Sequence, residues 1–469
     1  MPNSSDARAP MENDAKLAGS GHLEKSHTRG FKTLCLMLLL LAACEFTIRG
    51  PVRAIRSATG FNDFLSPYIQ AHAWRIGLDP YSPQVLLRLW PRQAQQFLFL
   101  PKEVASGTSV VTRGLPTAYP ITALVLLAPF SLLPWPVAYG VWLALNLALF
   151  AGMVAALLEL AGLSYGEPRG LLLMAGMLAL APFHTALVTA NPTLLAVELS
   201  IGGILFARRR QEISAAVLVG LATGLKPQIG LVFLVYFLLR RRWRIFLPAA
   251  AGVGCLAGMG LLRLEISHTS WLANYLHNNQ VQLETGVLGI FTPVNPIRFG
   301  LIHLQVALYP MLGNSLTTNQ VALTMGAVLS ITWFALWLRR HHASSELLDL
   351  SAIAVISLLP VYHRFYDACL LALPLCWAFV WFRRKRALAI LSGFLLLPFL
   401  VPGGTVLQTL VEIGRIPAGL ANRWWWQSFV MAHEVWLLLL LSILLLYGMA
   451  TNAAEVSPQR AQESAEGSP

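Results

Sequence analysis

Asp63 is the first of the few ionisable residues in this chain that could do chemistry. It stands in the run Phe61-Asn62-Asp63-Phe64, shortly after the first apolar segment. Placing a carboxylate at a membrane interface costs free energy. Such a carboxylate can act as a general base by accepting a proton from a hydroxyl group. The alternative is a structural role, as a helix cap or as the partner of Arg53 or Arg56 in a salt bridge. The spacing is compatible with either role.

Three cationic residues could bind a phosphate group. Lys226 precedes Pro227 inside an otherwise apolar segment, and His363 and Arg364 stand together between two later apolar segments. A lysine binds phosphate as a point charge and an arginine binds it with two hydrogen bonds. Asp367 could orient His363 or Arg364. The alternatives are a lysine that extends its ammonium group toward a helix end and a salt bridge between Arg364 and Asp367.

Amide side chains suited to sugar hydroxyl groups follow one another in a polar segment farther along the chain. Asn278, Asn279 and Gln280 each carry both a donor and an acceptor. They are equally at home as ordinary loop residues. Glu198 lies within an apolar segment, and we expect it to bond to a neighbouring helix.

The composition indicates the class of protein that positions these residues. Of the 469 residues, 56% are hydrophobic and only 12% are charged, whereas soluble domains carry roughly 25% charged residues. The cysteine spacing is typical of neither a zinc site nor a disulfide framework. No phosphate-binding glycine loop is visible. The sequence therefore predicts a membrane protein and gives no support for a nucleotide-dependent mechanism, a cofactor or a metal site.

Much of the positive charge lies in short clusters at the ends of apolar runs, which is typical of cytoplasmic loops. The formal charge of +12 is therefore attributed to membrane topology, and a nucleic-acid partner is excluded. The clusters are Arg208-Arg209-Arg210, Arg240-Arg241-Arg242 with Arg244, Arg339-Arg340 and Arg383-Arg384-Lys385-Arg386.

The apolar segments predict an all-α polytopic membrane protein with roughly 11–13 transmembrane helices. We expect a disordered cytoplasmic N-terminus (1–30), a transmembrane domain (31–450) and a disordered cytoplasmic tail (451–469). Outer loops are expected at about 49–116, 263–318 and 407–430, the first of them with interfacial helices.

A topological problem arises in the middle of the chain. If every apolar segment crosses the membrane, Arg208 to Arg210 fall outside, against the charge rule. One solution is that 171–207 crosses once as a broken element and 213–239 forms a two-legged re-entrant pair. The other is that 213–239 crosses once and the Arg208 cluster is an exception. Either solution indicates a cavity, because irregular backbone at such depth must be surrounded by protein or water.

The candidate residues gather on the extracytoplasmic side of the predicted topology, where there is no pool of nucleotide sugars. A glycosyl transfer at that face needs a donor carried by a lipid, and a base, a cationic phosphate site and amide groups would suit it. Two other functions stay open. A transporter or flippase for lipid-linked saccharides would distribute polar residues through the bundle. A non-catalytic scaffold would tolerate replacement of Asp63, Lys226 and His363.

A series of short motifs lies between about residues 60 and 382. They are Asp63-Phe64, Tyr68, Ala71, Gly77, Asp79-Pro80-Tyr81, Tyr119-Pro120, Gly224-Leu225-Lys226-Pro227 followed by Arg240 to Arg244, Asn279-Gln280, His363, Asp367 and Pro374. In their order and spacing these motifs resemble those of glycosyltransferase family 87, a family of GT-C membrane enzymes related to polyprenyl-phosphate-mannose-dependent mannosyltransferases. The chain departs from the family at Asn191-Pro192, where a Gly-Gln pair is common, and at Ile121, where a second proline is common.

The resemblance implies a GT-C type bundle in the plasma membrane, with its N-terminus in the cytoplasm. It also implies an inverting transfer of mannose, or of a related hexose or pentose, from a polyprenyl phosphate to a glycolipid or envelope glycan. Asp63 would be the base, and Lys226 and His363, to which we add Arg364, would hold the donor phosphate. The expected substrate contacts are Tyr68, Asn279, Gln280 and Asp367.

Overall fold

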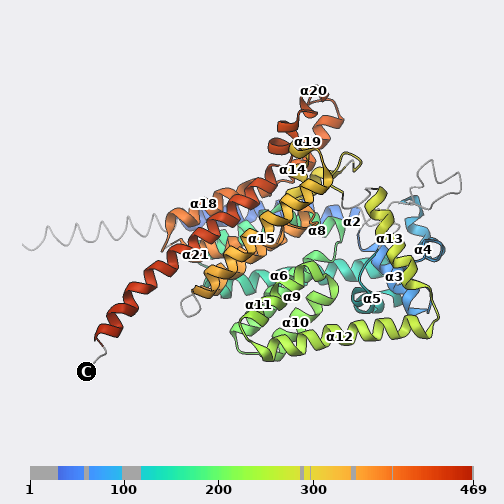
Figure 1. Cartoon of the computed structure of the whole chain (residues 1–469), viewed down its shortest axis with the longest axis horizontal. Coiled ribbons are helices and arrows are strands. Elements are labelled where there is room, and N and C mark those ends of the chain that lie inside the picture. The colour runs from blue at the N-terminus through green and yellow to red at the C-terminus, as the bar shows by residue number, and fades with distance from the viewer. Residues whose placement is uncertain are drawn as a thin grey trace, which may run out of the picture.

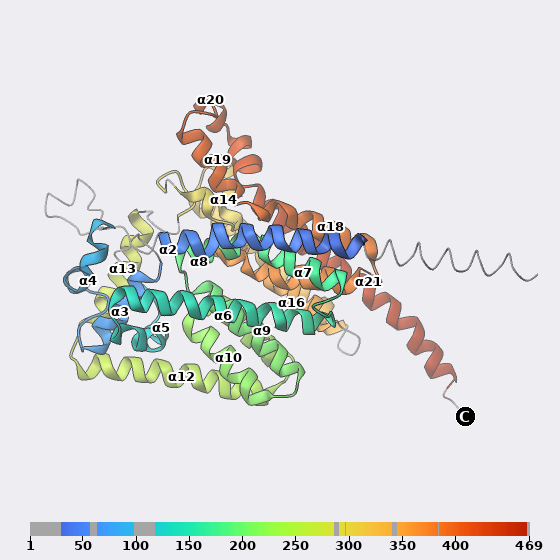
Figure 2. The same ribbon diagram turned by 180° about the vertical axis from the view of Figure 1, so that it is seen from behind.

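Helices form the regular secondary structure throughout the part of the chain that the computed structural model describes, which is residues 30–56, 63–97, 118–285, 290–295, 297–339, 345–382 and 384–466. Long helices lie side by side, and many of the short ones gather toward one end (Figure 1 and, from behind, Figure 2). The predicted fold class, an all-helical polytopic membrane protein, is confirmed. The expected disordered N-terminus, except Gly30, lies outside the described residues.

Six helices within the described residues are long and apolar enough to cross a membrane, with 19 to 27 residues each. At about 1.5 Å per residue they match a hydrocarbon core about 30 Å thick. They are Gly30–Arg56, which contains the π-helical turn η1 (Ile48–Val52) and ends in α2 (Arg53–Arg56); α6 (Trp135–Ala161); α12 (Trp243–Ile266); α15 (Ser315–Arg339); Arg386–Glu412, made of α18 (Arg386–Leu396), η7 (Leu397–Leu400) and α19 (Gly403–Glu412); and the segment His433–Thr451 of α21 (His433–Glu466).

Together, α7 (Pro168–Ala179) and α8 (Ala181–Thr189) are also long and apolar enough to span a membrane, with a bend of 45° between them, and counted as one span they would be the seventh. The other helices of the bundle are shorter. They are α5 (Ile121–Leu127) with η4 (Ala128–Leu132), α9 (Thr193–Arg208), α10 (Glu212–Leu225), α11 (Pro227–Leu239), α16 (Glu346–Ser357), and η6 (Phe365–Leu371) with α17 (Ala372–Trp381).

Two of the arginine clusters lie together at one end of the bundle, which we call the arginine end. Arg209 forms an ion pair with Glu159 near the end of α6, and Arg208 donates to the carbonyl oxygen of Leu160 at 2.7 Å. Arg242 donates to the carbonyl oxygen of Ala207 at 3.1 Å. The clusters at residues 208–210 and 240–242 therefore share one end, as the charge pattern predicts.

Helices α10 and α11 form the two-legged pair predicted for 213–239. They have 14 and 13 residues, about 20 Å each, which is too short to cross the bilayer core. The pair leaves the arginine end, turns at Lys226 and returns. Gly230 permits the close approach of the two legs, because a Cβ atom at this position would overlap the backbone of Thr223.

The single crossing of 171–207, which is one part of the first of the two solutions, is not the arrangement in the structure. The bent pair α7–α8 begins beside the end of α6, where Gly170 packs against Ser164 and Leu158, and α9 returns to the arginine end. The arginine clusters still fall at one end of the bundle because α5 and η4 do not cross. These two helices stay at the end opposite the arginine end. Thr122 at the start of α5 donates to the carbonyl oxygen of Gly224 at 2.6 Å.

The predicted outer loops are largely helical in the described residues, because hydropathy detects spans and not short helices that lie at a bundle end. After the first span come α3 (Leu65–Arg75), α4 (Pro83–Leu89) and the 3₁₀ helix η2 (Arg92–Phe97). The second loop holds α13 (Trp271–Thr285), η5 (Arg298–Gly300) and α14 (Leu304–Leu312). The third holds α20 (Ala418–Ala421) and η8 (Trp426–Met431).

The tail predicted to be disordered from residue 451 continues α21 as a helix to Glu466. A helix that is already formed extends one hydrogen bond at a time and needs no new nucleus. Polarity alone therefore does not end it.

Candidate active site

A buried polar cluster lies where α8, α9 and η6 meet the turn between α10 and α11. Asp367 in η6 and Lys226 at this turn belong to the cluster. The Asp367 side chain is fully buried. Oδ1 accepts hydrogen bonds from Lys226 Nζ at 2.7 Å and from Thr193 Oγ1 at 2.6 Å. Oδ2 accepts one from the backbone N–H of Arg364 at 2.9 Å and lies 3.2 Å from His363 Nδ1. A buried carboxylate needs such partners, and here it has them at both oxygens.

Within this cluster the positive charge of Lys226 is balanced by a carboxylate, and each of its N–H bonds has an acceptor. Its ammonium group has three N–H bonds, and its acceptors are Asp367 Oδ1, Asn191 Oδ1 at 3.1 Å, and the hydroxyl oxygen of Thr193. The ring of Tyr366 lies 4.9 Å from Nζ and adds a cation–π contact. Its position at the turn between α10 and α11, fixed by Pro227, brings the ammonium group to these partners.

Asn191 connects the cluster to Asp63. Its Oδ1 accepts from Lys226 and from the backbone N–H of Thr193 at 2.9 Å, so its Nδ2 is left to donate to Asp63 Oδ2 at 2.8 Å. The sequence assigned no role to Asn191 or Thr193, and Asn191 stood out only as a departure from the family pattern. The one signal in the sequence that could have found them is that both are polar and stand at the start of an apolar segment.

Asp63 is held by its backbone as well as by Asn191. Its N–H donates to the carbonyl oxygen of Thr189 at the end of α8 at 2.7 Å, and its carbonyl oxygen accepts from the hydroxyl group of Tyr119 at 3.3 Å. The next residue, Phe64, stacks on Trp142 with ring centroids 4.4 Å apart. The alternative role as a helix cap does not apply, because the N-cap of α3 is Phe64.

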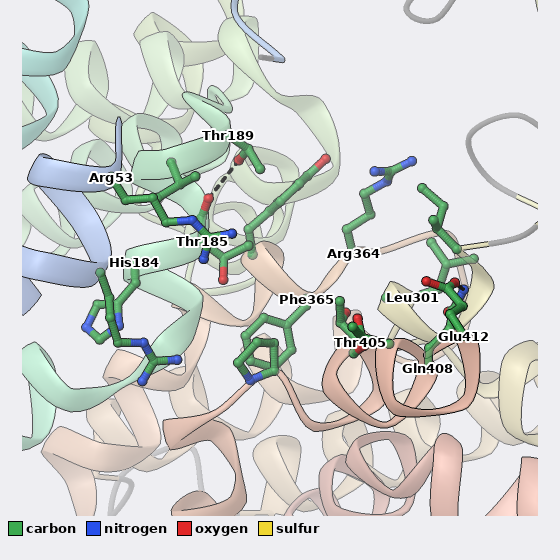
Figure 3. A pocket seen from close by; sticks show the side chains of 17 residues that line it. Arg53, His184, Thr185, Thr189, Leu301, Arg364, Phe365, Thr405, Gln408 and Glu412 are labelled. Carbon is green, nitrogen blue, oxygen red and sulfur yellow. Dashed lines mark hydrogen bonds between the residues drawn. The ribbon is translucent and has the colours of Figure 1, made fainter. Parts of the chain in front are cut away.

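A cavity of about 380 Å³ adjoins this cluster. Thr189 and Tyr366 line it, and these residues also contact Asp63 and Lys226 respectively. Figure 3 shows Arg53, His184 and Thr185 on one side and Arg364, Gln408 and Glu412 on the other. The elements that enclose it are the end of the first span, α8, the η5 region, η6 and α19.

Arg364 is the predicted phosphate ligand that lines the cavity. Its Nε donates to the hydroxyl group of Tyr362 at 2.7 Å, and its backbone is fixed by Asp367. His363 is fully buried and contacts Asp367 instead. In place of the alternative salt bridge between Arg364 and Asp367, the structure has a hydrogen bond from the Arg364 backbone, and Lys226 forms the ion pair with Asp367.

The structure does not bring Tyr68, Asn279 and Gln280 into the cavity lining. Tyr68 is buried and donates to the carbonyl oxygen of Leu133 at 2.8 Å, and Asn279 donates to the carbonyl oxygen of Tyr275 one turn back in α13. Gln280 lies on the same helix and is exposed.

The connection between α13 and Asp63 runs through their neighbours. Asn278 donates to the carbonyl oxygen of Tyr81 at 2.8 Å, and the Tyr81 hydroxyl donates to the carbonyl oxygen of Tyr119 at 2.8 Å. Tyr119 in turn contacts Asp63. Burial raises the pKa of the Tyr81 phenol well above its usual value, so the hydroxyl keeps the proton that this link requires.

The histidine, cysteine, aspartate and glutamate side chains of the described residues include no group of three or more placed as metal ligands would be. The polar cluster is instead built from one ammonium group, an imidazole, carboxylates, an amide and hydroxyl groups. Such a set can position a base and balance charge.

The fold and the cluster define a polytopic, all-helical membrane protein with a carboxylate held beside a cationic cavity. The sequence model of glycosyltransferase family 87 matches residues 117–363, which is more than half of the 469 residues. The chain belongs to glycosyltransferase family 87 and is a membrane glycosyltransferase. Asp63, Arg364 and Asp367 lie outside the matched range. No curated protein and no solved structure gives a significant match to the chain.

Proposed function

We propose that this glycosyltransferase takes its sugar, mannose or a related hexose or pentose, from a polyprenyl phosphate and transfers it to a glycolipid or envelope glycan. The observation that carries this proposal is the position of Asp63. Its carboxylate is bonded through Asn191 to the Lys226–Asp367 pair, and its backbone is bonded to Thr189, which lines the cavity with Arg364.

In the proposed reaction, the Asp63 carboxylate accepts the proton of the acceptor hydroxyl group. The hydroxyl oxygen attacks the anomeric carbon of the donor, and the bond between that carbon and the phosphate oxygen breaks. The electron pair leaves with the lipid phosphate, and the anomeric configuration is inverted. Asn191 supports Asp63 as a base, because its Nδ2 fixes one carboxylate oxygen and leaves the second for the proton.

The leaving phosphate gains negative charge, and Arg364 is positioned to stabilise it. Lys226 and His363 contribute to phosphate binding through Asp367, which holds the Arg364 backbone. Asn279 and Gln280 on α13 stay proposed substrate contacts. We propose no cofactor and no metal ion.

The proposed orientation follows from the arginine end. Clusters of Lys and Arg are retained in the cytoplasm during insertion, so the arginine end and the N-terminus would face the cytoplasm of a plasma membrane. Asp63 would then face the extracytoplasmic side, where a lipid carries the activated sugar.

The test is sugar transfer by the purified chain in lipid bilayers. Radiolabelled mannose is offered on polyprenyl phosphate or as a nucleotide sugar, with a membrane glycolipid extract as acceptor. We expect label in the glycolipid from the polyprenyl-phosphate donor alone. Equal transfer from the nucleotide sugar would contradict the proposed donor, and transport of intact lipid-linked sugar without transfer would favour a flippase.

A further inference from the structure

The lining of the cavity combines two kinds of side chain. Three arginines line it: Arg49, Arg53 and Arg364. On α19, the lining side chains are hydroxyl, amide and carboxylate groups, namely Thr405, Gln408, Thr409 and Glu412. Arginine matches phosphate oxygens, whereas amide and carboxylate groups accept hydrogen bonds from sugar hydroxyl groups.

Arg49 and Arg53 stand one turn apart at the end of the first span, and they are used differently. Arg49 forms an ion pair with Glu45 and donates to the carbonyl oxygen of Leu400 at 3.1 Å. The bond to Leu400 joins the first span to the helix that ends in α19. The Arg53 guanidinium lines the cavity without a hydrogen bond or ion pair to any of the residues that the structure describes. A guanidinium without a protein partner is available to an anionic ligand.

A lipid is the source that best fits a phosphate at this position. The cavity lies between the ends of two membrane-spanning helices, Gly30–Arg56 and Arg386–Glu412. Both helices expose large apolar side chains, among them Ile48 and Ile55 on the first and Leu397 and Val401 on the second. A hydrocarbon chain can lie along such surfaces while its phosphate enters the cavity.

We propose that this cavity binds the phosphate of a lipid-linked substrate between Arg53 and Arg364, and that Gln408 and Glu412 of α19 contact the attached sugar. The assignment of the sugar rests on the proposed function. Glu412 accepts a hydrogen bond from Gln408 at 3.1 Å, and its carboxylate repels a phosphate and can accept further hydrogen bonds from hydroxyl groups. Arg53 and α19 are thereby assigned to substrate binding, and α19 to the choice of sugar.

The proposed phosphate site is tested by measuring binding, without any transfer reaction. Wild type, Arg53→Gln and Arg56→Gln are placed in nanodiscs and titrated with polyprenyl phosphate that carries no sugar. Arg56 is the matched control, since it lies on the same short helix, is exposed and does not line the cavity. We expect binding to weaken about tenfold in Arg53→Gln and less than about twofold in Arg56→Gln.

Two further probes separate the sources of the phosphate. Uncharged polyprenol reports on the lipid chain alone, and inorganic phosphate reports on the anion alone. Competition by inorganic phosphate assigns the site to any phosphate, and binding of polyprenyl phosphate without such competition assigns it to the lipid. Equal binding of polyprenol and polyprenyl phosphate, or equal loss in both arginine variants, would overturn the proposal.

The sugar half is tested with Glu412→Gln and Gln408→Ala. We expect unchanged affinity for polyprenyl phosphate and a KM for the sugar-bearing donor that rises about tenfold. Wild type that binds polyprenyl phosphate through Arg53 but transfers no sugar would uphold the phosphate site and defeat the proposed function. Sugar transfer that is unaffected by Arg53→Gln would uphold the function and defeat the site.

Discussion

The polar cluster around Lys226 and the cavity around Arg53 are neighbours, and positive charge is treated differently in each. Lys226 is only 9% exposed, and its charge is balanced by Asp367 at 2.7 Å. Arg53 is exposed to the cavity and has no partner among the described residues. The first cation completes an internal network, whereas the second is available to a ligand.

The difference shows that the polar cluster and the cavity have different roles in one site. Burying a charge is tolerated when a partner and hydrogen bonds compensate for lost hydration, and the cluster meets that condition at every oxygen of Asp367. Such a network is rigid, so it can hold Asp63 through Asn191. A phosphate needs uncompensated positive charge, and the cavity supplies it. Substitutions in the two regions should therefore have different effects.

Asp63 lies between the two regions, and its loss should have the largest effect. In Asp63→Asn the side chain can still accept the hydrogen bond from Asn191, but it cannot act as a base. Transfer should fall by about 10²–10⁴-fold, the usual contribution of a general base. Labelled donor turnover, with thermal unfolding as the control for folding, checks this. Activity close to wild type would remove Asp63 from the mechanism.

Asp367→Asn should destabilise the cluster. The substitution leaves the Lys226 ammonium group buried without a carboxylate, which costs about 3–5 kcal/mol. Removing both charges in Lys226→Gln/Asp367→Asn should recover much of the loss. Unfolding monitored by tryptophan fluorescence measures it, with Arg53→Gln as the control that should keep the wild-type stability. Equal destabilisation by Arg53→Gln would erase the distinction between the two regions.

Asn191→Ala should reduce the rate with little change in binding. The amide positions Asp63, and losing a buried hydrogen bond of this kind costs about 1–3 kcal/mol. We expect kcat to fall about tenfold while the KM for the donor changes less than about twofold. A rise in KM at constant kcat would assign Asn191 to substrate binding instead.

Tyr68→Phe should have the smallest effect. Its hydroxyl group donates to the carbonyl oxygen of Leu133, and removing one such bond costs about 0.5–1.5 kcal/mol of stability. Transfer should stay within about twofold of wild type, because the residue does not line the cavity. A large loss of transfer at unchanged stability would restore the substrate contact that the family resemblance implies.

Several features could be predicted from the sequence alone because they depend on local composition. Apolar segments and flanking arginines predict helices that cross a membrane, and they do so whatever their neighbours are. The motifs from Asp63 to Pro374 identify the family, and Asp63, Lys226, His363 and Asp367 do gather in one region of the fold.

The tertiary structure decided what each of these residues contacts. Lys226 and Asp367 are 141 residues apart in the sequence, and no local pattern indicates that they neutralise each other. No local pattern indicates the contact between Asn191 and Asp63 either. Nor does one indicate that Arg53 of the first span lines the same cavity as α19. The short helix α5 is apolar like a true span, and only its packing beside Gly224 shows that it does not cross. Hydropathy is a property of a segment, whereas charge pairing and cavity lining are properties of how segments pack.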